Sequence, residues 1–208
     1  MKIESGRYYH IYNRGINSRK TFFTDKDFNR FLDKYNYYLG LSFKTLAYCL
    51  MSNHFHFLVK VISEKEQQTA ILNHEKSDLS PEYYILPNPN KRIFKIENLL
   101  SHLLNSHTKY INSKYKRTGP LWDGNFKIRM IETDEYLQQC ICYIHRNPIH
   151  HGLTNSYTAY PFSSFNEVLN NQSIIINPST ALDIFGSRDN YVAAHQEVKA
   201  FPESYRLE

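Results

Sequence analysis

His54 and His56 have the type and spacing of a metal-binding pair. They open the run HFHFLVKV, residues 54–61, whose aromatic and β-branched content predicts a strand. Successive side chains on a strand point to opposite faces, so both imidazoles share one side and Phe55 and Phe57 share the other. If the phenylalanines enter the core, the imidazoles can hold one divalent ion at about 2.0–2.2 Å. A same-face pair without a ligand is the alternative interpretation.

Tyr143 is the candidate nucleophile of the sequence. It lies in a predicted helix with Asn147 four residues later, so the two side chains share one helix face. Tyr136 and Gln139 lie further back along roughly the same stripe. The alternative is a core tyrosine at position 143 and an asparagine that caps the helix before Pro148.

Five stretches resemble the HUH single-tyrosine transposases. AYCLMSNHFHFLVKV resembles their central strands, and YIHRNPIHHGL resembles the signature of the REP-associated tyrosine transposase branch. The other three are YYHIYNRGINSRKTFF, GPLWDGNFKIRMI and PFSSF. The resemblance covers residues 7–62 and 96–166, and the pairing of HFHFLV with YIHRNP is more specific than either piece alone.

The resemblance implies a chemistry and a set of roles. His54 and His56 become ligands of Mg²⁺ or Mn²⁺, and Asn147 takes the place of a third ligand that is often glutamine in relatives. Tyr143 becomes the nucleophile that stays on the 5′ phosphate of single-stranded DNA while a 3′ hydroxyl leaves, near a hairpin. The implied partner is single-stranded or hairpin DNA and not a membrane. Relatives act as homodimers or as monomers.

Basic and aromatic residues offer a surface for DNA. The net charge is +5 and the pI is about 8.9, which suggests a polyanionic partner without proving one. Cations can follow phosphates while an aromatic ring stacks on an unpaired base. The candidates are Arg14, Lys114, Lys116, Arg117, Trp122, Lys127 and Arg129. For the cluster at 114–117 the alternative is a favourable helix C-terminus.

The order of predicted elements indicates an α/β (α+β) fold. We expect strands at 7–13, 43–51, 54–61 and 125–131. We expect one helix after Thr24, one over 96–115, and one from Thr133 to about Arg146, where Asn147-Pro148 disfavours continuation. Without the last helix this order matches a ferredoxin-like antiparallel sheet with helices packed on one face.

The chain divides into one transposase-like domain and an extension. The domain covers 1–166, with a polar insertion at about 63–94, and the C-terminal extension covers 167–208. Cys49, Cys140 and Cys142 do not have metal-site spacing and are expected to be reduced. The sequence starts without a signal peptide and has no apolar run of the roughly 20 residues that a membrane span needs, so a cytoplasmic location is expected.

Three functions remain open at this stage. The first is a metal-dependent endonuclease and strand transferase that works through a phosphotyrosine. The second is a non-catalytic protein that binds single-stranded or hairpin DNA. The third is a metal phosphodiesterase in which water attacks and Tyr143 is structural. A covalent protein–DNA adduct separates the first from the other two.

Overall fold

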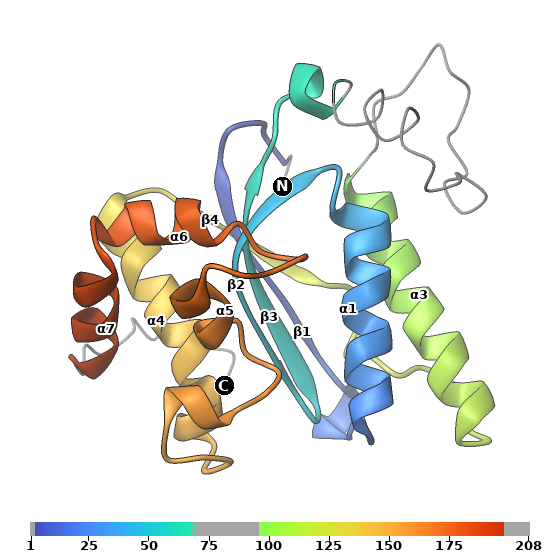
Figure 1. Ribbon diagram of the computed structural model, residues 1–208. Coiled ribbons are helices and arrows are strands. Elements are labelled where there is room, and N and C mark those ends of the chain that lie inside the picture. The colour runs from blue at the N-terminus through green and yellow to red at the C-terminus, as the bar shows by residue number, and fades with distance from the viewer. Residues whose placement is uncertain (1–2, 68, 70–95, 198–208) are drawn as a thin grey trace.

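The computed structural model describes residues 3–67, 69 and 96–197 (Figure 1). Most of the insertion predicted at 63–94 therefore lies outside the described residues, as does the end of the extension, 198–208. The rest of the chain forms a mixed α/β fold around one antiparallel sheet.

The four predicted strands all form and pair antiparallel. They are β1 (Tyr8–Arg14), β2 (Phe43–Met51), β3 (His54–Val61) and β4 (Lys127–Ile131), in the order β2-β3-β1-β4. The bounds of β2 and β3 are those predicted. Both strands are mainly apolar and are buried at nearly every position, as strands covered on both faces are.

Two helices cover one face of the sheet. They are α1 (Asp25–Leu39), which begins with a capping box between Thr24 and Asp27, and α3 (Ile96–Lys114). Figure 1 shows them side by side. Aromatic stacking joins α1 to β3: the Tyr35 and Phe57 rings are 3.9 Å apart. This is the helical layer of the ferredoxin-like plan.

The helix α4 (Asp134–His150) lies on the other face of the sheet (Figure 1). Its Thr133 cap accepts a hydrogen bond from the Tyr136 N–H, as predicted. The predicted end near Arg146 is wrong, because the helix continues through Pro148. Proline removes one backbone donor. The turn around it is buried, and the His151 N–H again bonds within the helix, to the Asn147 carbonyl at 3.0 Å.

The C-terminal segment forms short helices around α4. They are the 3₁₀ helix η2 (Tyr157–Ala159) and the helices α5 (Phe165–Asn170), α6 (Pro178–Phe185) and α7 (Arg188–Gln196). A further 3₁₀ helix, η1 (Ile16–Ser18), lies outside this segment, directly after β1. We predicted a tail without clear periodicity, and each helix is indeed too short to show one.

The outer edge of β2 is covered by backbone of the same C-terminal segment. The Leu50 N–H donates to the Phe162 carbonyl at 2.9 Å, and the Ser164 N–H donates to the Tyr48 carbonyl at 3.0 Å. The segment therefore continues the sheet where an edge strand would otherwise leave its backbone unpaired. Among the described residues, no helix has the length and hydrophobicity to cross a bilayer.

Candidate active site

His54 and His56 both face α4. Their ring centroids are 5.3 Å apart, while Phe55 and Phe57 point to the opposite side and pack against Phe31 of α1. His56 is fully buried and His54 is 8% exposed. The strand alternation thus separates a polar pair from an apolar pair, as the sequence predicts.

The helix α4 brings Tyr143 and Asn147 to this pair. The Tyr143 ring meets the His56 ring edge-on, with centroids 5.6 Å apart. One turn later, the Asn147 amide donates to the Tyr143 carbonyl at 2.9 Å, and its side chain also contacts His54. His54 and His56 of β3 are therefore neighbours of Tyr143 and Asn147 of α4, although the two elements are far apart in the sequence.

A third histidine, His10 of β1, completes the buried cluster. Its Nε2 lies 2.9 Å from Nδ1 of His56, and their rings stack with centroids 5.1 Å apart. No motif in the sequence points to His10. The signal that could have found it is the alternation of β1, which puts His10, Tyr12 and Arg14 on one face. Tyr12 pairs with His56 and Arg14 pairs with His54 on the neighbouring strand, so this is also the face of the histidine pair.

The free nitrogens of this cluster fit a divalent ion. His56 Nε2 is buried and has no hydrogen-bond partner. His54 donates its Nδ1–H to Asn53 Oδ1 at 2.7 Å. The side-chain amide of Asn53 is held in that orientation because its nitrogen donates a hydrogen bond to the Ser18 carbonyl at 3.3 Å. His54 therefore keeps its lone pair on Nε2. Two neutral imidazoles, one with an unpartnered Nε2 and one with Nε2 turned from its Asn53 bond, are a suitable start for a metal site.

The third ligand has to come from another residue type. No group of three His, Cys, Asp or Glu within the described ranges is arranged to hold a metal. Asn147 is the candidate for this position, since its amide nitrogen donates to the Tyr143 carbonyl and its side chain also contacts His54. An amide oxygen also suits Mg²⁺ or Mn²⁺, because these ions prefer oxygen ligands to imidazole nitrogen.

Burial keeps the three histidines neutral. It lowers the pKa of His10 and of His54 to about 3, with smaller contributions from Arg129 to the first and from His151 and Arg14 to the second. Burial also holds the pKa of His56 well below its usual range, followed by the charges of the neighbouring histidines. Neutral imidazole is the form that binds a cation.

Three of the predicted DNA-binding residues lie on the face of the histidines. Arg14 pairs with His54 across β1 and β3 and forms an ion pair with Asp123 at 3.0 Å. On β4, Lys127 is opposite Tyr12 and Arg129 is opposite His10. Both β4 cations are exposed, so phosphates can reach them.

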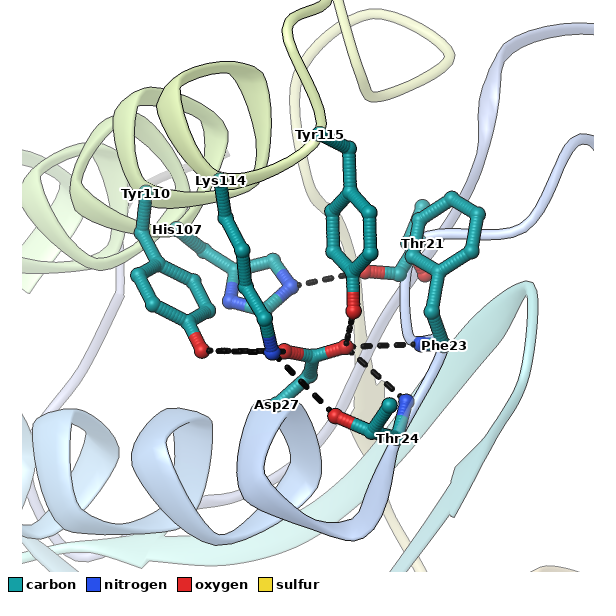
Figure 2. Close-up of polar contacts among 8 residues, drawn as sticks. All are labelled: Thr21, Phe23, Thr24, Asp27, His107, Tyr110, Lys114 and Tyr115. Carbon is teal, nitrogen blue, oxygen red and sulfur yellow. Dashed lines mark hydrogen bonds and ion pairs between the residues drawn. The ribbon is translucent and has the colours of Figure 1, made fainter.

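Lys114 forms an ion pair with the buried carboxylate of Asp27 (Figure 2). Its Nζ lies 2.6 Å from Oδ1 of Asp27, and the hydroxyls of Tyr110 and Tyr115 donate to the same carboxylate at 3.0 and 2.8 Å. Burial alone would raise the pKa of Asp27, but the bonds from Lys114, Tyr115 and two backbone N–H groups lower it far below its usual range. Lys114 thus links α3 to the start of α1.

Lys116 and Arg117 follow directly on α3, which packs on the sheet face away from α4. Trp122 requires a correction. It is buried, its Nε1–H donates to the Leu104 carbonyl at 3.2 Å, and its ring packs on Phe55 at 5.4 Å. The predicted stacking of Trp122 on an unpaired base is wrong, because the indole belongs to the core.

Comparison with known proteins places the chain beside DNA transposases. No family model matches it. A Haemophilus influenzae protein described as a REP-associated tyrosine transposase is 25% identical over 126 residues, which are 59% of each chain. The solved structure of a REP-associated tyrosine transposase bound to a REP hairpin superposes with a TM-score of 0.53, covering 82% of this chain and 83% of that one at 15% identity.

The chain is similar to REP-associated tyrosine transposases. The sequence match carries this relation, and the structural likeness adds the fold. The chain matches only 59% of the length of its curated relative. Two structures of a bacterial tRNA(His) guanylyltransferase-like protein, with GTP and with ATP, cover 73% and 91% of this chain and 70% and 75% of theirs. Their TM-scores are 0.35 and 0.40 at 10% identity.

Proposed function

We propose that this chain is a metal-dependent DNA endonuclease and strand transferase of the transposase type. Its substrate is single-stranded DNA beside a hairpin. The observation that carries the proposal is the edge-on contact of Tyr143 with His56, whose Nε2 is buried and has no hydrogen-bond partner. A phenol beside a ligand-ready imidazole pair is the arrangement that attack on a phosphodiester needs.

His54 and His56, with the Asn147 oxygen, would hold the ion. When bound, Mg²⁺ or Mn²⁺ withdraws charge from the phosphate oxygens and orients the phosphodiester. The residues themselves set the geometry: β3 fixes the two imidazoles, and the bond from Asn147 to the Tyr143 carbonyl fixes the turn that carries the nucleophile. Arg14, Lys127 and Arg129 place the DNA backbone over this face.

In the cleavage step, Oη of Tyr143 forms a bond to phosphorus and the bond from phosphorus to the 3′ oxygen breaks. The phenolic proton is released, and the leaving 3′ oxygen takes up a proton to become a hydroxyl. The phosphotyrosine conserves the phosphodiester bond energy, so the reverse attack by a 3′ hydroxyl rejoins DNA without a nucleotide cofactor. The usual phenol pKa near 10 means that a nearby cation assists ionisation.

The test is an SDS-stable adduct between the protein and a hairpin oligonucleotide labelled at the 5′ or the 3′ side of the cleavage site. The proposal predicts that only the fragment carrying the 5′ phosphate stays with the protein. Tyr143→Phe should abolish the adduct and keep hairpin affinity. The matched control is Tyr136→Phe, about two turns earlier on the same helix, which should form the adduct normally.

Two results would contradict the proposal in different ways. Cleavage without an adduct, at the same rate in Tyr143→Phe, would identify water as the nucleophile. Hairpin binding without cleavage, in the presence of Mg²⁺ and of Mn²⁺, would identify a non-catalytic DNA-binding protein.

A further inference from the structure

The side of α4 that faces away from Tyr143 is joined to the C-terminal segment. His145 follows Tyr143 by two positions, which is roughly 200° around a helix. It is 1% exposed and lies against α5 and α7 instead of the histidine cluster. The helix therefore carries the candidate nucleophile on one side and a buried polar contact on the other.

The hydrogen bonds of His145 form a chain with one direction. A backbone carbonyl only accepts, so His195 must donate its Nδ1–H to the Tyr191 carbonyl at 2.7 Å. His195 Nε2 is then an acceptor, and His145 must donate its Nδ1–H to it at 2.9 Å. His145 Nε2 is in turn an acceptor, and it takes the hydroxyl hydrogen of Ser164 at 2.8 Å.

Ser164 passes this chain on to the sheet. Its Oγ accepts the Tyr48 N–H at 2.8 Å, and its own N–H donates to the Tyr48 carbonyl at 3.0 Å. Tyr48 also donates its hydroxyl to Glu167 of α5. Tyr48 lies on β2, directly beside the Cys49 that pairs with His56 on β3. The chain thus runs from α7 through α4 to the strand next to the histidine pair.

The groups of this network use their hydrogen bonds on one another. Ser164 is 0% exposed and His195 is 3% exposed, and both ring nitrogens of His145 and of His195 have a protein partner, unlike Nε2 of His56. A fully satisfied polar network in the interior fixes one packing arrangement, because any other leaves a buried donor or acceptor without a partner. The role open to the network is to hold elements in place.

We propose that the segment 163–196 is a positioning clamp, in which Ser164 and His195 bind His145 of α4 and so set the placement of Tyr143 relative to His56. The inference rests on the proposed function for its catalytic consequence. The clamp contacts α4 through His145 and β2 through Ser164. It therefore ties the helix of Tyr143 to the strand that pairs with the histidine strand β3. A displacement of about 1 Å in such a site costs on the order of 100-fold in rate.

The first variants are His195→Ala and Ser164→Ala in the full chain. His195→Ala removes the nearer acceptor of the His145 Nδ1–H, at 2.9 Å, and leaves only the Tyr191 hydroxyl at 3.2 Å. Ser164→Ala leaves His145 Nε2 without its donor. Matched controls are His102→Ala and Ser113→Ala, both exposed on α3 at the far face of the sheet. Adduct formation is measured in a single turnover at saturating hairpin, well below the unfolding temperature of each variant, together with hairpin affinity.

We expect adduct formation at least 10-fold slower per folded molecule in both clamp variants, with hairpin affinity within about twofold of the parent. His195→Gln should recover much of the rate, because a glutamine amide can donate to the Tyr191 carbonyl and accept from His145. A general loss of stability would lower the unfolding temperature without this split between rate and affinity. Unchanged rates in both clamp variants would overturn the clamp.

A second measurement separates the clamp from the proposed function. We place 3-fluorotyrosine at position 143 and record its ¹⁹F signal, which depends on the nearby His56 ring. His195→Ala should shift or broaden the signal, and His102→Ala should not. If the parent protein forms no adduct, the proposed function fails, and the ¹⁹F signal still decides the clamp: an identical signal in His195→Ala overturns it.

Discussion

His10 Nε2 lies 2.9 Å from Nδ1 of His56, at the centre of the sheet where both rings are fully buried. An ion on Nε2 of His56 requires that Nδ1 carries the proton. His10 must then accept a hydrogen bond from this Nδ1–H through the lone pair on its Nε2. In that tautomer, His10 is the acceptor that orients His56, in the way that outer partners orient metal-binding histidines.

Replacing His10 should weaken metal binding. We expect His10→Phe to bind Mn²⁺ about 10–100-fold more weakly, because His56 loses the acceptor that fixes its tautomer. Isothermal titration calorimetry with Mn²⁺ measures the affinity without DNA. His10→Gln keeps an acceptor oxygen and should retain more of the affinity, and His102→Ala is the control on the opposite face. Equal affinities in His10→Phe and the parent would disprove this role of His10.

The charge on β4 should contribute to the salt dependence of DNA binding. Lys127 is exposed on the face of the histidines, whereas Lys116 follows α3 on the other face of the sheet. Lys127→Gln should reduce the slope of log affinity against log salt by about 0.7 for single-stranded DNA, the value for one lost phosphate contact. Fluorescence anisotropy between low and moderate salt provides the slope. Lys116→Gln carries the same charge change, and a larger effect there would contradict the placement.

The Asp27 carboxylate should stabilise the fold more than any surface ion pair. Asp27→Asn removes the charge that Lys114, Tyr110 and Tyr115 all share (Figure 2). We expect the free energy of unfolding to fall by about 2 kcal/mol, since buried donors lose their charged acceptor. Urea denaturation measures this value. The control is Asp25→Asn, an exposed residue of the same first turn, whose effect should stay below about 0.5 kcal/mol.

His107 should make the stability depend on pH between about 6.5 and 4. Its Nε2–H donates to the Thr21 carbonyl at 2.9 Å, and burial lowers its pKa to about 4. The unfolded chain, with a histidine pKa near 6.5, binds the proton first. Stability is therefore full above pH 6.5 and is lost as the pH falls towards 4, by up to about 3 kcal/mol.

The difference between the parent and His107→Gln isolates this contribution from those of the other buried histidines. Glutamine keeps a donor for the Thr21 carbonyl and does not titrate, so its unfolding free energy should vary less with pH over this window. Parallel urea denaturation at pH 7, 5.5 and 4.5 provides the comparison. Identical pH profiles for the two proteins would show that His107 has no depressed pKa.

Local sequence patterns predicted the strands and the polar face of β3 well. The alternation of His54, Phe55, His56 and Phe57 is a purely local property, and a strand turns it directly into two faces. The i to i+4 relation of Tyr143 and Asn147 is equally local. The two patterns meet because α4 packs on β2 and β3, and for that contact only the family resemblance gave a prediction.

Long-range packing decided what the sequence could not show. From the sequence, Trp122 was expected to stack on a base. In the structure it packs under α3, and its N–H donates to the Leu104 carbonyl of that helix. His10 gained its importance from a partner 46 positions away. Pro148 ended the predicted helix on local grounds, yet the buried turn around it outweighs one missing hydrogen bond. Each of these differences depends on residues that are distant in sequence.

The coverage of the β2 edge has a consequence for how the chain is synthesised. Leu50 pairs with Phe162, more than a hundred positions later. At a translation rate of about 5–20 residues per second, on the order of 10 s separates the synthesis of β2 from that of its cover. During this interval the emerging hydrophobic strand offers an open edge to other nascent chains. Once covered, the sheet meets solvent at β4, where Lys127 and Arg129 discourage strand addition and so protect the folded protein from aggregation.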